Sequence, residues 1–244
     1  MSVVTPYAAL RRRTGESPAA PLVTYVDPES GVRMELSATS LDNAVAKTAG
    51  LLRDELDVSP GDHIAIHLPW HWQRAVWLGA CAATETVFAA DAAPVDCAVC
   101  VMDRHHLDQS GGAGEDVLVS LDPFGLPDGG PIPPGVTEAA VAMRSHPDRF
   151  NAYVEPRGDA PLLAIGGGVV TSDAVMEMGH HLAQVRGLAP GARVAVLPDD
   201  PDRDILLLAV PLALNGSVVL LGRETPQVPR LLLDEDAVLT KESP

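Results

Sequence analysis

A pattern that occurs twice limits the folds open to this chain more than any other feature. Residues 56–70 read LDVSPGDHIAIHLPW, and residues 186–200 read RGLAPGARVAVLPDD. In each copy a proline-glycine turn precedes a short β-rich run that ends in Leu-Pro, and only one residue of spacing differs between the copies. Internal similarity of this kind predicts two units of similar structure.

The first copy predicts a helix, a strand, a second helix and a second strand. Ser37 can cap a helix through its hydroxyl group. Apolar residues then recur at helical spacing between residues 41 and 52, which is typical of an amphipathic helix. The run HIAIHL at residues 63–68 predicts a strand, residues 70–83 a second helix and residues 86–90 a second strand.

The second copy predicts the same order. Thr171 or Ser172 can cap a helix, and strand, helix and strand patterns follow at residues 193–197, 204–214 and 217–221. Strands joined through helices run parallel and are connected by right-handed crossovers. The continuous apolar runs of this copy suit strands that are buried on both faces.

The repeat therefore predicts an α/β fold of two similar layered subdomains with mostly parallel sheets. We expect residues 1–157 to form the first subdomain, with a loop-rich insertion. Residues 158–244 should form the second subdomain, with a short helix after residue 225 and a loose C-terminal tail.

The charge of the chain argues against nucleic acids and membranes as partners. Lys and Arg number 17 and Asp and Glu 33, which gives a formal net charge of -16. Nucleic-acid binding needs a basic surface, and we interpret Arg11–Arg13 as a solvated N-terminal arm. An acidic surface repels anionic lipids. The longest apolar run, residues 205–221, falls short of the roughly 20 residues that span a bilayer.

The cysteine count and the N-terminus favour the cytoplasm. Three cysteines, an odd number, suggest a reducing compartment. The first residues contain no apolar stretch long enough for a secretory signal.

The residues of the first copy resemble a known family. LSATSLDNAVAKTAGLLRDELDVSPGDHIAIHLPWHW at residues 36–72, continuing to TVFAADAAP at residues 86–94, resembles the opening of the adenylate-forming enzymes. These are the acyl-CoA synthetases, luciferases and peptide-synthetase adenylation domains, whose N-terminal domain contains two related α/β subdomains. The resemblance covers about residues 21–222, and the chain is also similar to short actinobacterial proteins related to these enzymes.

The resemblance draws attention to the segment before the second-copy helix. In the family a Ser/Thr/Gly-rich loop ending in Pro-Lys-Gly holds the ATP phosphates there, whereas this chain has PLLAIGGGVVTSDAV at residues 161–175. We predict a tight connection in which the strand runs through the glycines directly into the helix cap. The alternative is residual nucleotide or phosphate binding by backbone N–H groups at a helix N-terminus. The residues that would make such contacts are Gly166, Gly167, Gly168, Thr171 and Ser172.

Other parts of the family's catalytic machinery are also missing from this sequence. The aromatic-His segment after the second Leu-Pro is replaced by DDPDRD at residues 199–204. The later nucleotide and Mg²⁺ motifs, and the C-terminal domain with its catalytic lysine, would lie beyond residue 244. Adenylation develops negative charge that Lys, Arg or Mg²⁺ normally stabilises.

The resemblance therefore implies a shortened, non-catalytic relative that acts as a ligand-binding or protein-interaction module. We assign no catalytic residue and expect no cofactor. The alternative is a divergent acyl-adenylate or acyl-CoA ligase, or one that a protein partner or a second copy of the chain completes.

Polar and aromatic residues gather after the first predicted strand. Because open α/β sheets bind ligands at the carboxyl ends of their strands, His67, Trp70 and His71 could form the wall of a ligand pocket. Burial of the aromatic side chains between the two halves is the other interpretation.

Two patterns resemble metal sites but are incomplete. Cys97-x-x-Cys100 followed by His105 and His106 lacks a second pair of ligands. Residues three apart on a strand face opposite sides, so we interpret these cysteines as core residues.

The acidic run at Asp200, Asp202 and Asp204 alternates like a calcium loop but lacks the required glycine and the final glutamate. We therefore assign no metal. Cys81 lies within a helical pattern and is expected in the core.

Overall fold

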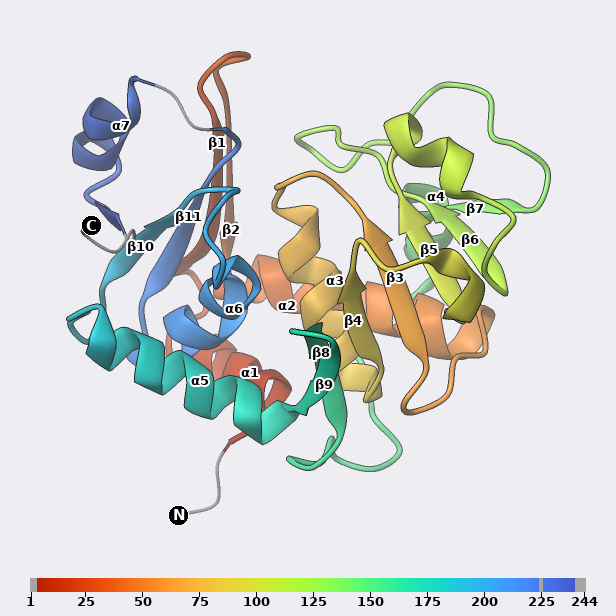
Figure 1. Ribbon diagram of the computed structural model, residues 1–244, viewed down its shortest axis with the longest axis horizontal. Coiled ribbons are helices and arrows are strands. Elements are labelled where there is room, and N and C mark those ends of the chain that lie inside the picture. The colour runs from red at the N-terminus through yellow and green to blue at the C-terminus, as the bar shows by residue number, and fades with distance from the viewer. Residues whose placement is uncertain (1–3, 224–225, 240–244) are drawn as a thin grey trace.

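Two mostly parallel β-sheets lie on either side of a layer of helices in the computed structural model, which describes residues 4–223 and 226–239 (Figure 1). One sheet has seven strands and the other has five. The predicted α/β fold with mostly parallel sheets is confirmed. Within the described ranges, no helix is long and apolar enough to cross a lipid bilayer.

The seven-stranded sheet contains the first copy of the repeat. In spatial order its strands are β7 (Val136–Glu138), β6 (Glu115–Leu118), β5 (Val99–Met102), β3 (His63–His67), β4 (Val87–Ala90), β8 (Pro161–Ile165) and β9 (Gly168–Thr171). Neighbouring strands are parallel throughout, except that β9 is antiparallel to β8.

The five-stranded sheet contains the second copy. In spatial order its strands are β12 (Val238–Leu239), β10 (Arg193–Val196), β11 (Ser217–Leu221), β1 (Pro21–Asp27) and β2 (Val32–Ser37). In this sheet, among the described strands, β1 and β2 are antiparallel and the other neighbouring pairs are parallel.

The two copies of the repeat fold in the same order. Their helices are α2 (Ala38–Gly50) and α3 (Gln73–Thr84) in the first copy, and α5 (Ser172–Val185) and α6 (Arg203–Leu214) in the second. Both α3 and α6 end at a residue with left-handed backbone, Glu85 and Asn215. The predicted cap is also present, since Ser37 Oγ accepts a hydrogen bond from the N–H of Ser40 at 3.1 Å.

Each sheet also takes a strand pair from elsewhere in the chain. β1 and β2 precede the first copy, yet β1 pairs with β11 of the second copy, with Val23 opposite Val218. β8 and β9 follow residue 157, yet β8 pairs with β4 of the first copy. Each sheet therefore contains strands from both sides of the boundary predicted between residues 157 and 158.

The glycine segment forms a β-hairpin, so the predicted tight strand–helix connection is wrong. Gly166 and Gly167 make the turn with φ of +60° and +79°. Two consecutive positive φ angles are what a two-residue type I′ turn requires, and glycine adopts them without a steric penalty. Gly168 begins β9 opposite Ile165, so a whole strand separates the turn from α5.

The N-terminal segment is a packed helix, and the prediction of a solvated arm is wrong. Helix α1 (Pro6–Glu16) contacts α2, α3, α5 and α6 within the helical layer (Figure 1). Arg13 is 9% exposed and donates a hydrogen bond to the side chain of Asn215. Arg11 forms an ion pair with Asp42 of α2. The arginines therefore stabilise contacts between the helices.

Short helical elements connect the remaining strands. They are the π-helical turn η1 (Leu51–Glu55), the 3₁₀ turns η2 (Pro94–Asp96), η3 (Arg104–Gln109) and η4 (Met143–Ser145), and helix α4 (Ala139–Ala142). Strands β5 and β6 lie between these elements.

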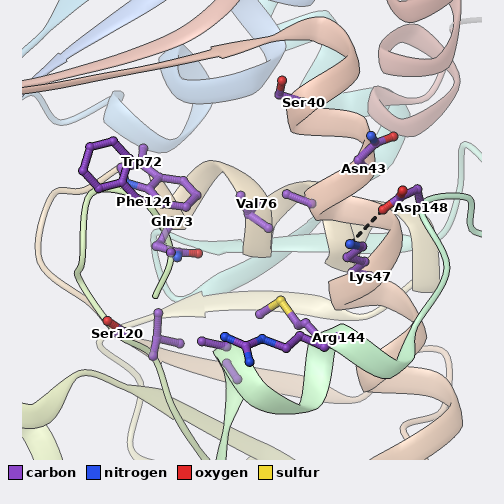
Figure 2. Close-up of a pocket in the computed structure, with 16 residues that line it drawn as sticks. Ser40, Asn43, Lys47, Trp72, Gln73, Val76, Ser120, Phe124, Arg144 and Asp148 are labelled. Carbon is purple, nitrogen blue, oxygen red and sulfur yellow. Dashed lines mark ion pairs between the residues drawn. The ribbon is translucent and has the colours of Figure 1, made fainter. Parts of the chain in front are cut away.

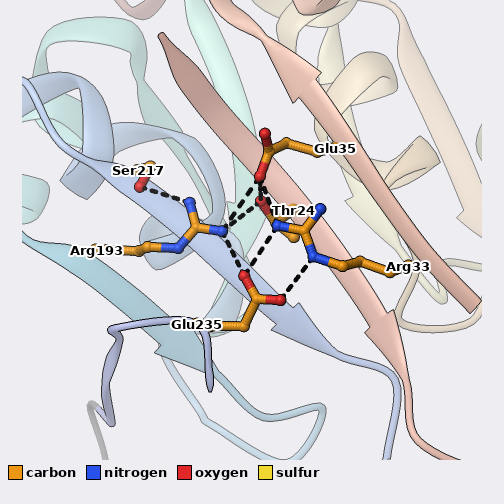
Figure 3. Close-up of polar contacts among 6 residues, drawn as sticks. All are labelled: Thr24, Arg33, Glu35, Arg193, Ser217 and Glu235. Carbon is orange, nitrogen blue, oxygen red and sulfur yellow. Dashed lines mark hydrogen bonds and ion pairs between the residues drawn. The ribbon is translucent and has the colours of Figure 1, made fainter. Parts of the chain in front are cut away.

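The outer face of the five-stranded sheet is covered by α7 (Val228–Asp234), which confirms the short helix predicted after residue 225. Figure 3 shows how a polar network joins the end of α7 to the sheet. Glu235 accepts hydrogen bonds from Arg33 Nε and Arg193 Nη2, each at 2.7 Å. These bonds, chiefly the one from Arg33, lower the pKa of Glu235. The predicted loose tail, residues 240–244, lies outside the described residues.

Candidate functional site

The carboxyl ends of the parallel strands lie together at one end of the seven-stranded sheet, called here the carboxyl edge. At this edge the connections that leave neighbouring strands run to opposite sides of the sheet. From β3 the chain passes through α3 to β4 on one side, whereas from β5 it passes to β6 on the other side. Ligands of open α/β sheets bind at such a switch point. His67 ends β3 and is followed by Trp70 and His71, so these predicted residues lie at this edge.

His67 and His106 lie on either side of the switch point. Their ring centroids are 6.2 Å apart. His67 Nε2 is 2.9 Å from the carbonyl oxygen of Ala92, and His106 Nδ1 contacts the carboxylate of buried Asp103. Asp103 was not among the residues predicted from the sequence. Its position directly after the buried strand β5 is the signal that could have identified it.

Trp70 joins the two sheets. The side chain is 6% exposed, and its indole N–H donates a hydrogen bond to the carbonyl oxygen of Val196 in β10 at 3.2 Å. This geometry matches the interpretation in which aromatic side chains are buried between the halves. Helix α3 begins at Gln73 rather than at the predicted residue 70, and Trp70 lies in the segment that precedes the helix.

His71 is also buried, at 4% exposure. Its ring makes an edge contact with Tyr25 of β1, with 4.6 Å between centroids, and lies 5.4 Å from the ring of Trp72. Burial lowers the pKa of His71 from 6.5 to about 4. The imidazole is therefore neutral in the folded protein at neutral pH.

We expect His71 to make the protein less stable as the pH falls from 7 to 4. In this range the unfolded chain binds a proton at His71 that the folded chain does not, so stability rises with pH between the folded and unfolded pKa values. A shift from 6.5 to about 4 corresponds to about 3 kcal/mol at pH 4. Urea denaturation at both pH values should show that the loss is about 3 kcal/mol smaller in His71→Gln than in the wild type. An equal loss in both proteins would contradict the prediction.

The predicted phosphate-contact residues divide between the two ends of the β8–β9 hairpin. Because β8 is parallel to β4, Gly166 and Gly167 lie at the carboxyl edge of the sheet. Thr171 lies opposite Pro161 at the other end of the hairpin, and Ser172 is buried. The Thr171 hydroxyl donates to the carboxylate of Asp173. The structure therefore does not bring the glycine turn together with Thr171 and Ser172, and their role as ligand contacts stays a prediction.

A cavity of about 300 Å³ lies between the end of β8 and the DDPDRD loop before α6. Its charged lining residues are Asp199, Asp200, Asp202, Arg203 and Asp204. The lining is therefore dominated by carboxylates.

Two arginines next to this cavity already donate hydrogen bonds to the aspartates that line it. Arg186 donates to Asp200 at 2.8 Å and also to Asp202, and the hydrogen bond to Asp200 is the main cause that raises the pKa of Arg186. Arg74 donates to Asp204 at 3.0 Å. A phosphate group that entered the cavity would have to compete with these carboxylates for the guanidinium groups.

The sequence patterns that resemble metal sites do not come together. No three His, Cys, Asp or Glu side chains in the described part of the chain are placed to hold a metal ion. Cys97 lies just before β5, so the prediction that Cys97 and Cys100 face opposite sides of a strand is wrong. Both pack in one apolar cluster, and burial raises the pKa of Cys100 to about 12. Cys81 is buried, as predicted.

A second pocket at the carboxyl edge, the α3–α4 pocket, has a volume of about 440 Å³ (Figure 2). It lies between α2, the start of α3 and the segments that follow β6 and β7. Lys47, Arg144 and Asp148 are its charged lining residues, and Trp72 and Phe124 are its aromatic ones. This pocket was not predicted from the sequence, because its lining comes from segments far apart along the chain.

Comparison with known proteins gives one clear relative in sequence. No protein-family model matches the chain. A TIGR03089 family protein from Mycobacterium tuberculosis (strain ATCC 25618 / H37Rv) is 37% identical over 222 residues, and the match covers 86% of each chain.

Several solved structures share the fold. The N-terminal domain of FACL13 from Mycobacterium tuberculosis, solved with an inhibitor, has a TM-score of 0.73 at 16% identity, covering 96% of this chain and 61% of that one. Brucella canis acyl-CoA synthetase has a TM-score of 0.80 at 14% identity, covering 98% and 47%. Acetoacetyl-CoA synthetase from Streptomyces lividans has a TM-score of 0.70 at 21% identity, covering 88% and 38%.

The chain thus spans less than two thirds of the length of these solved proteins. At such low identities the likeness shows the fold alone, and it confirms that the chain folds like the N-terminal domains of acyl-CoA synthetases. Because the mycobacterial relative is 37% identical over 86% of both sequences, this chain belongs to the TIGR03089 family.

Proposed function

We propose that this protein is a binding module with the acyl-CoA synthetase fold that does not form acyl adenylates by itself. The observation that carries the proposal is the β8–β9 hairpin. It precedes α5, at the place in the chain where the adenylate-forming enzymes hold the ATP phosphates.

The turn of the hairpin has no side chain that could bind a triphosphate. It consists of Gly166 and Gly167 and contains neither a hydroxyl side chain nor a lysine. Lys47, the lysine among the described residues, lies in α2 and lines the α3–α4 pocket instead. Transfer of phosphoryl groups depends on cations that stabilise the developing negative charge.

The cavity beside the turn supports the same conclusion. Like charges repel each other most strongly where water is excluded, and aspartates predominate in the lining of this cavity. Arg186 and Arg74 are bonded to those aspartates. Arg203 also lines the cavity, and it donates a hydrogen bond to the carbonyl oxygen of Pro198. A triphosphate would therefore meet more carboxylates than cations.

A binding role is supported by what the fold retains. The α3–α4 pocket opens at the carboxyl edge, where sheets of this type bind ligands. Its volume of about 440 Å³ lies within the range of about 300–1,000 Å³ that is usual for small-molecule sites.

The buried cysteines support a cytoplasmic location as part of this proposal. Cys81, Cys97 and Cys100 are free thiols. Thiols persist in this state in reducing compartments.

Exchange of labelled pyrophosphate into ATP tests the proposal, because the assay detects adenylation without a later acceptor. We expect the purified protein, supplied with Mg²⁺ and a panel of short, long-chain and aromatic carboxylic acids, to give no exchange above the level without protein. Calorimetric titration with Mg²⁺–ATP should also show no binding tighter than about 1 mM.

An acyl-CoA synthetase assayed in the same buffers provides the positive control. Exchange that depends on this protein and on one of the acids would contradict the proposal. Exchange that appears only after a second chain is added would instead identify a ligase completed by a partner.

A further inference from the structure

We propose that the α3–α4 pocket binds a small organic anion that has a flat apolar body. The inference rests on the proposed role as a binding module and deepens it by naming the site and the class of ligand. The site is separate from the acidic cavity beside the glycine hairpin, since the two share no lining residue.

The charge of the pocket is opposite to that of the chain. The formal net charge of the chain is -16, yet the pocket is lined by two cations, Lys47 and Arg144, and by one carboxylate, Asp148. Low-dielectric walls around a charged cleft strengthen its local potential. An anion is therefore favoured here over a neutral or cationic molecule of the same shape.

Both cations are available to a ligand. Lys47 pairs with Asp148 at 2.8 Å, but the Asp148 side chain is 64% exposed. Exposed pairs of this kind contribute little stability, so an incoming anion can share the ammonium group at low cost. Within the described ranges, Arg144 has no ion pair or hydrogen bond through its side chain. A guanidinium group can bind a carboxylate with two parallel hydrogen bonds.

The aromatic residues lie at the other end of the pocket. Figure 2 shows Trp72 and Phe124 on one side of the view and the pair formed by Lys47 and Asp148 on the other. Trp72 is 6% exposed, whereas Phe124 is 81% exposed on the loop after β6. Aromatic walls of this kind favour flat apolar groups through stacked or edge contacts.

Polar residues also lie at the aromatic end. The indole N–H of Trp72 is buried and has no hydrogen-bond partner among the described residues. Gln73 and Ser120, both largely buried, line the pocket nearby. The site thus combines a cationic end with an apolar end that carries a few polar groups.

Three ligands with the same body and different charge test the proposal. They are 4-phenylbutanoate, its neutral amide 4-phenylbutanamide and the cation 4-phenylbutylammonium, each titrated into the full chain by isothermal calorimetry. We expect the anion to bind about tenfold or more tightly than the amide, because hydrogen bonds to charged groups are stronger than neutral ones. The cation should bind most weakly.

Variants of the lining residues test whether the preference for the anion over the amide arises in this pocket. The double variant Lys47→Gln with Arg144→Gln should bring the ratio between anion and amide close to one. Phe124→Ala should weaken both ligands by a similar factor. Arg149→Gln, an exposed arginine that does not line the pocket, is the matched control and should leave the ratio unchanged.

Equal affinities for anion and amide would overturn the proposal, and so would a preference that survives the double variant. Absence of binding by all three ligands at about 10 mM would also overturn it. These results are distinguishable from failure of the proposed function. Pyrophosphate exchange would refute the non-catalytic role, whereas loss of the anion preference in a protein without exchange would refute only the assignment of this pocket.

Discussion

Replacing Arg74 with alanine is expected to lower the free energy of unfolding by about 3–5 kcal/mol, because it breaks a buried ion pair between the two halves. Arg74 of α3 is 1% exposed. Its guanidinium donates to the carbonyl oxygen of Leu68 at 2.9 Å and to the carboxylate of Asp204 in α6 at 3.0 Å, and it lies over the ring of Phe88. Removing the cation leaves Asp204, which is mostly buried, without its partner. Urea denaturation measures the loss.

Two further variants make this prediction specific. Arg230→Ala removes an arginine whose side chain is 85% exposed, and it should change stability by less than about 0.5 kcal/mol. Arg74→Met combined with Asp204→Leu should recover part of the loss, since no uncompensated charge then remains in the interior. If Arg74→Ala were as stable as Arg230→Ala, the pair would not hold the halves together.

Replacing Trp70 with alanine is expected to cost about 3–5 kcal/mol, as is usual for removing a buried tryptophan. The side chain fills the space between the sheets and donates its indole N–H to Val196. Trp70→Phe should cost less, about 1–2 kcal/mol, because it keeps most of the buried area and loses mainly the hydrogen bond.

Phe124→Ala is the matched control for aromatic removal. Its ring is 81% exposed, so we expect a change within about 0.5 kcal/mol by the same urea denaturation. A small effect of Trp70→Ala would show that Trp70 does not bridge the halves. Its position at the carboxyl edge would then favour the pocket-wall interpretation instead.

The repeat is the part of the fold that could be predicted best from the sequence. Its signals are local: the turns at Pro60 and Pro190, the amphipathic spacing between residues 41 and 52, and the apolar run at residues 217–221. Each signal depends on neighbours along the chain, and these segments fold as expected. The turn at Gly166 and Gly167 was predicted wrongly, because glycine permits both a direct connection and a reversal.

Less of the candidate site than of the fold could be predicted from the sequence. His67 and Trp70 were correctly placed at the carboxyl end of a strand, since that position follows from the order of elements. The α3–α4 pocket could not be predicted in this way. Lys47, Trp72 and Arg144 meet there only because α2, α3 and the segment after β7 pack together.

By itself, the sequence determined the doubled helix–strand order and the α/β class, because periodicity and turn chemistry are properties of adjacent residues. The tertiary structure alone decided which sheet each strand joins, how α1 is buried between the helices and where the cationic and aromatic residues meet. These outcomes depend on contacts between residues distant along the chain, and such contacts form wherever strand edges and apolar faces find partners in space.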